Sequence, residues 1–60
     1  MTRERLERIV ATTRESVARR GAVFSDADCQ RAVDAGMQAD DDGPHAWAAA
    51  VEQVLMEAWA

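Results

Sequence analysis

The sequence predicts an all-α fold, a small three-helix bundle with helices at about 2–20, 26–39 and 44–60. Apolar residues recur at helical spacing in three stretches, turn residues separate the stretches, and suitable cap residues precede each one. A chain of 60 residues holds one small domain, so we treat 1–60 as a single unit.

The first helix is predicted from a stripe of inward-facing residues with caps at both ends. Thr2 is a suitable N-cap, and Gly21 stands where a left-handed residue commonly closes a helix. The stripe lies within an arc of about 100° and consists of Leu6, Ile9, Val10, Thr13 and Val17.

The second helix is predicted to begin after Ser25, because Ser25 and Asp28 fit the acidic form of a capping box. Phe24 precedes the cap, in the position of a hydrophobic staple. The apolar face of this helix is thin, consisting of Cys29, Ala32, Val33, Gly36 and Met37. Gly36 has two interpretations: it permits a close helix approach, or it ends the helix early.

The third helix is predicted to follow an acidic turn. Three aspartates at 40–42 oppose the dipole of a preceding helix C-terminus, and Pro44 suits a first helical position. The stripe of this helix is Trp47, Val51, Val54, Leu55 and Ala58. Trp59 lies on its edge, and Met56 lies off it.

The larger apolar residues are few for a chain that folds alone. Leu, Ile, Val and Phe together number ten, whereas alanine is abundant. Burial of so few large side chains barely offsets the entropy lost on ordering the chain. We therefore expect a partner protein, or a second copy in a homodimer, to complete the core.

No constellation of residues indicates an enzyme, a metal or a cofactor. Cys29 and His45 each occur once, with no third residue marked out to orient them as a nucleophile and its base. A calcium loop counted from Asp26 or from Asp40 lacks both the glycine and the final glutamate that such a loop needs. We therefore expect a non-enzymatic protein without a cofactor.

The cysteine count and the hydropathy pattern favour a cytoplasmic location. A single cysteine makes no intramolecular disulfide, and no apolar run reaches the length of a signal peptide or of a membrane span. We accordingly expect no contact with a membrane.

The charge distribution separates the first helix from the rest. Six arginines and three glutamates give residues 1–21 a charge of +3, whereas one arginine and eight acidic residues give the remainder −7. The third helix holds no arginine or lysine, so direct binding to nucleic acid is disfavoured. Bare DNA would be a partner only through the first helix.

Our leading hypothesis is a protein that occupies a basic surface on a larger protein or complex. Basic clefts commonly hold nucleic acid, so an acidic helical protein would act there as a DNA mimic. The expected partner-binding residues are Asp34, Asp40, Asp41 and Asp42 for charge, with Met56 and Trp59 as apolar anchors.

In length, acidity, alanine content and absence of lysine, the chain resembles small proteins of high-GC bacteria and their phages. Phage inhibitors of host defence complexes, including anti-CRISPR proteins, are often of this build. The alternative is a structural or docking subunit, for example one that is antitoxin-like, whose main contact is the apolar stripe of the third helix.

Overall fold

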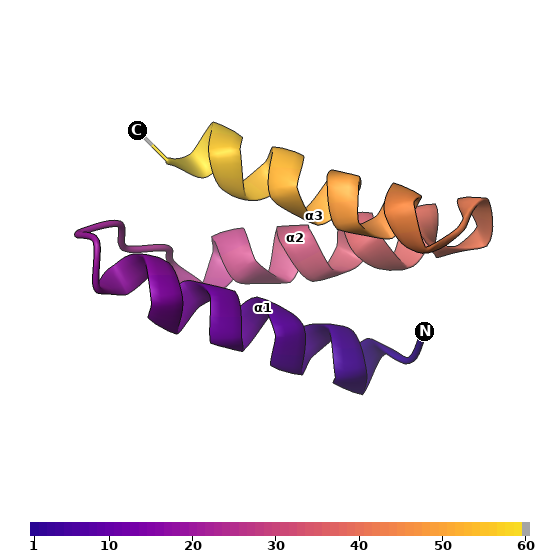
Figure 1. Ribbon diagram of the computed structural model, residues 1–60, viewed down its shortest axis with the longest axis horizontal. Helices are drawn as coiled ribbons and strands as arrows, with labels where there is room; N and C mark the ends of the chain where they lie inside the picture. The colour runs from indigo at the N-terminus through magenta and orange to yellow at the C-terminus, as the bar shows by residue number, and fades with distance from the viewer. Residues whose placement is uncertain (60) are drawn as a thin grey trace.

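The computed structural model describes residues 1–59, which form three α-helices and one short 3-10 helix (Figure 1). The helices are α1 (Arg3–Ala18), α2 (Asp26–Ala39) and α3 (Pro44–Ala58), with η1 (Asp40–Asp42) in the link between α2 and α3. α2 runs antiparallel to its two neighbours, so α1 and α3 run parallel to each other. The predicted all-α three-helix bundle is confirmed.

The predicted helix starts are also confirmed. Thr2 Oγ1 accepts a hydrogen bond from the Arg5 backbone N–H at 3.2 Å. Ser25 and Asp28 form a reciprocal capping box, in which each side chain accepts a hydrogen bond from the other residue's backbone N–H. Pro44 occupies the first turn of α3.

Two predicted helix ends were too late. α1 ends at Ala18 rather than at 20, because the Gly21 N–H donates to Ala18 O and the Ala22 N–H donates to Val17 O, both at 3.1 Å. This pair of bonds is a Schellman motif, and Gly21 adopts the positive φ of 92° that the motif requires.

α3 was predicted to reach 60, but it ends at Ala58. Trp59 is extended, with φ −82° and ψ 91°, and its ring meets Phe24 edge-on at a centroid distance of 6.1 Å. Leaving the helix at this point brings the two rings together. Residue 60 lies outside the described residues.

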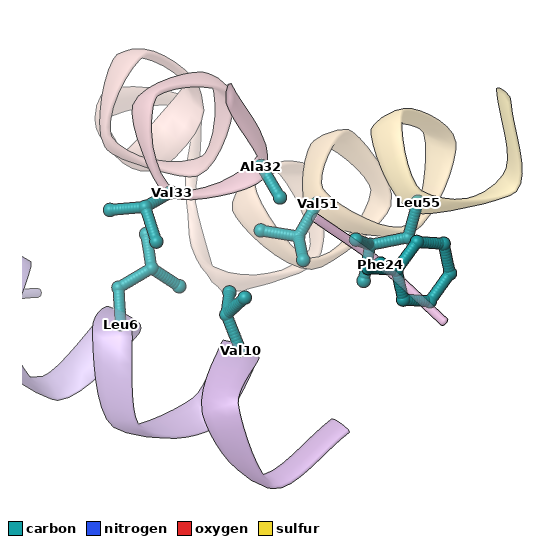
Figure 2. Close-up of a cluster of buried hydrophobic side chains, with 7 residues drawn as sticks. All are labelled: Leu6, Val10, Phe24, Ala32, Val33, Val51 and Leu55. Atoms are coloured by element: carbon teal, nitrogen blue, oxygen red, sulfur yellow. The ribbon is translucent and has the colours of Figure 1, made fainter. Parts of the chain in front are cut away.

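The core draws on all three helices and on the first link (Figure 2). The predicted stripes supply every member but one, and the exception is Phe24, which is 1% exposed and is the largest of the fully buried side chains. The buried cluster comprises Leu6, Val10, Phe24, Ala32, Val33, Val51 and Leu55.

The structure decides between the two interpretations of Gly36. Gly36 is buried within α2, and the helix continues to Ala39, so the early end is wrong. A Cβ atom at Gly36 would lie 2.6 Å from Leu6 Cδ2 and 2.8 Å from Val51 Cγ2. Gly36 therefore permits the side chains of α1 and α3 to approach the α2 backbone closely.

Candidate protein-docking groove

An open, mainly apolar groove of about 410 Å³ lies between α1 and α3. Its α1 side presents Ile9, Thr13 and Val17, which are all partly exposed. The α3 side contributes the two buried core residues Val51 and Leu55. Together these side chains form what we call the groove floor.

The groove exists because α2 packs against both neighbours, and more extensively against α3, while α1 and α3 meet each other less. The side chains of α1 and α3 that turn away from α2 are therefore only partly covered. Trp47 illustrates this: it packs against the core cluster on one side, lines the groove on the other, and remains partly exposed.

Two large apolar side chains lie exposed along the α3 side of the groove. Met56 is 64% exposed and Trp59 is 51% exposed, and both line the groove. Trp59 is held by its edge-to-face contact with Phe24, at an interplanar angle of 81°. Exposed large apolar side chains gathered beside a groove are typical of contact surfaces between proteins.

The rims of the groove carry opposite charges. Arg5 and Arg8 line a shallow hollow on the exposed flank of α1, next to Ile9 and Thr13 of the floor. Glu52, which is exposed, lies on the α3 rim together with the exposed Ala48. Within residues 1–59, Arg5, Arg8 and Glu52 take part in no ion pair.

The structure pairs several of the aspartates with basic groups of the same chain. Arg3 Nη2 lies 2.8 Å from Asp34 Oδ1, and this hydrogen bond is the main cause of a raised pKa at Arg3. The N-terminal ammonium of Met1 lies 3.1 Å from Asp40 Oδ2. Asp34 and Asp40, which were both predicted to contact a partner, therefore already form ion pairs within the chain.

Asp41 and Asp42 are exposed and make no ion pair among the described residues. They precede α3, whereas Met56 and Trp59 lie at its other end, about 20 Å away at a rise of 1.5 Å per residue. The predicted charged and apolar anchors thus form two separate surfaces rather than one. Their role in binding stays a prediction.

Cys29 and His45, considered as a nucleophile and its base, lie in different parts of the bundle. Cys29 is in the first turn of α2, near Arg14 of α1, whereas His45 is in the first turn of α3. α2 and α3 begin at opposite ends of the bundle (Figure 1). Among residues 1–59, no three His, Cys, Asp or Glu side chains gather as a metal site would require. None of the helices in that part of the chain has the length and hydrophobicity to cross a bilayer.

Sequence reasoning identified Met56 and Trp59, and its alternative hypothesis named the third-helix stripe, of which Trp47, Val51 and Leu55 line the groove. It missed the α1 side of the site, together with Ala48, Glu52 and the two rim arginines. The sequence did contain a signal for the groove. The apolar stripes of the first and third helices are broad, whereas the second helix has too few side chains, and too small ones, to cover both stripes.

No known family model matches the chain, and neither the curated proteins nor the solved structures contain a match to it.

Proposed function

We propose that the protein is a non-enzymatic docking module that binds an amphipathic helix of a partner protein in the groove between α1 and α3. The observation that carries the proposal is the groove itself, an open apolar trough flanked by exposed Met56 and Trp59. Of the two hypotheses from the sequence, this is the one in which the third helix makes the main contact.

The dimensions of the groove suit a helix. α3 is 15 residues long, so its length is about 22 Å, which matches about four turns of a bound helix. A helix that binds in this way places apolar residues at i, i+3 or i+4, and i+7 into the groove. Covering Met56 and Trp59 removes apolar area from water, and that burial is the main favourable contribution to binding.

A second candidate is the acidic inhibitor, a DNA mimic that binds a basic surface of a nucleic-acid-binding complex in the manner of some anti-CRISPR proteins. It is favoured by Asp41 and Asp42, which are exposed and adjacent in the turn before α3. It has less support than the groove, because basic groups of the same chain pair with the other four aspartates, Asp26, Asp28, Asp34 and Asp40. Either proposal includes a cytoplasmic setting, in which Cys29 remains a free thiol.

The test of groove docking uses two alanines that differ in whether they line the groove. Ala48 and Ala49 are both exposed on α3, but only Ala48 lines the groove. Ala48→Arg therefore obstructs the groove, whereas Ala49→Arg makes the same change in charge and size outside it. Wild type and both variants are immobilised as baits for a lysate of the native source, and bound proteins are identified by mass spectrometry.

We expect a partner that wild type and Ala49→Arg retain at about 0.5 M salt, where charge interactions are strongly screened, and that Ala48→Arg loses. Identical protein sets on all three baits would refute groove docking. A partner that leaves in high salt, and is lost on Asp41→Asn with Asp42→Asn, would favour the acidic inhibitor instead.

A further inference from the structure

We propose that the groove binds a second copy of this chain, giving a symmetric dimer in which α1 of each copy lies on α3 of the other. This inference rests on the proposed function, because it names the occupant of the same groove. The directions of the helices, the charges on the two rims and the size of the surface all favour self-association.

The helix directions permit a closed pair. A two-fold axis that runs along the groove, in the plane of the interface, turns a second copy face to face with the first, exchanges the two sides of the groove and keeps its direction. Because α1 and α3 are parallel within one copy, the rotation places α1 of the second copy parallel to α3 of the first and over it (Figure 1). The same contact is formed twice, so the pair is closed and exposes no further groove for a third copy.

The rim charges are complementary under this rotation. The α1 rim is basic, with Arg5 and Arg8, and the α3 rim carries the acidic Glu52. A groove with opposite charges on its two rims matches a rotated copy of itself, because each basic rim meets an acidic one. The three side chains are exposed and make no ion pair among residues 1–59, so all remain available for such a contact.

The exposed apolar residues lie on the same surface. Met56 and Trp59 line the groove and would be covered by the second copy, together with the partly exposed Ile9, Val17 and Trp47. Tryptophan, methionine and arginine are the residue types enriched in protein interfaces, and this surface contains all three. Dimerisation thus supplies the apolar burial that one copy lacks.

The size of the surface sets the expected strength. A patch about 22 Å long and two helices wide, or about 20 Å, has a projected area of about 440 Å² per copy. The accessible area of a rough surface exceeds its projection, so the pair buries on the order of 1,000 Å² in total, near the lower limit for specific interfaces. We therefore expect a reversible dimer with a dissociation constant on the order of 1–100 µM.

The test is a charge exchange measured by sedimentation equilibrium, with circular dichroism to verify that each variant is folded. Arg5→Glu with Arg8→Glu makes both rims acidic, and Glu52→Arg makes both rims basic. Each variant alone should raise the dissociation constant at least tenfold, because like charges now face each other. An equimolar mixture of the two should dimerise as wild type does, because the mixed pair restores opposite charges at both contacts. Glu57→Arg, which makes the same charge change outside the groove, should leave the constant unchanged.

The result that overturns the inference is a wild-type chain that stays monomeric up to about 1 mM, far above the expected constant. A dimer that the charge exchange neither weakens nor restores in the mixture would also overturn it. Either failure leaves the proposed function standing if Ala48→Arg still loses a captured partner, in which case the groove binds a helix of another protein. If, in addition, Ala48→Arg captures the same proteins as wild type, both proposals are refuted.

Discussion

Replacing Gly36 by alanine tests the close approach of the helices at the centre of the bundle. The added Cβ would lie 2.6 Å from Leu6 Cδ2 and 2.8 Å from Val51 Cγ2, well inside normal contact distance. Neither neighbour moves away easily, because Leu6 is 0% exposed and Val51 is β-branched, with a restricted χ1 in a helix. The helices must therefore separate slightly or hold strained rotamers.

Two opposing contributions decide the size of the effect. Overpacking a filled core costs about 1–3 kcal/mol, whereas alanine is favoured over glycine within a helix by about 1 kcal/mol. We expect a net loss of about 1 kcal/mol from a total stability of about 3–9 kcal/mol for 60 residues. A loss of this size lowers the melting temperature by about 4–8 °C.

The assay is urea unfolding followed by far-UV circular dichroism, at a protein concentration low enough to keep the chain monomeric. Val51→Ala alone should cost about 2 kcal/mol, because it removes two carbon atoms from the core and leaves a small cavity. Combined with Gly36→Ala, it provides space for the new methyl group, so the double variant should be more stable than additivity predicts, by about 1 kcal/mol. A Gly36→Ala protein more stable than wild type, or strict additivity in the double variant, would refute the close-packing argument.

Two further predictions concern the start of α2. Ser25→Ala removes the hydroxyl that accepts a hydrogen bond from the Asp28 N–H, and it should lower the free energy of unfolding in urea by about 1 kcal/mol. The control, Ser16→Ala on the exposed face of α1, should change that free energy little. Equal losses at both sites would argue against the cap. The hydrogen bond from Arg31, followed by those from Ser25, lowers the pKa of Asp28 below its ordinary value of 3.8. Because the unfolded chain then binds a proton more readily, the stabilisation is complete above about pH 4 and is lost as the pH falls through the lower pKa of the folded state. Asp28→Asn should flatten this part of the acid-unfolding profile, and an unchanged profile would contradict the assignment.

The helices and most of the core could be predicted because the relevant signals are local. A stripe such as Leu6, Val10 and Val17 is encoded by spacing within one helix, and a cap such as Ser25 is encoded by its neighbours. Phe24 could not be assigned to the core in this way. It lies on an extended link without periodicity, and only the packing of the three helices around the link buries it.

The candidate site could be predicted less fully from the sequence, because it depends on contacts between segments that are far apart in the chain. The pairing of Asp34 with Arg3, and of Asp40 with the N-terminal ammonium, joins residues far apart in the chain. No local pattern distinguishes these paired aspartates from Asp41 and Asp42, which make no ion pair within residues 1–59. The groove has the same origin, since it depends on the separation between α1 and α3, which spacing within either helix does not determine.

The small side chains of α2 connect the stability of the bundle with its exposed surface. Because Gly36 has no side chain, Leu6 and Val51 approach the α2 backbone there, and both belong to the buried core cluster. The space between α1 and α3 on the far side receives no side chain from α2, so apolar residues there stay partly exposed. Val51 belongs to both surfaces, because it contacts the Gly36 region and also forms part of the groove floor. A larger residue at position 36 would therefore disturb the groove together with the core, so the docking surface depends on the same close packing that stabilises the fold.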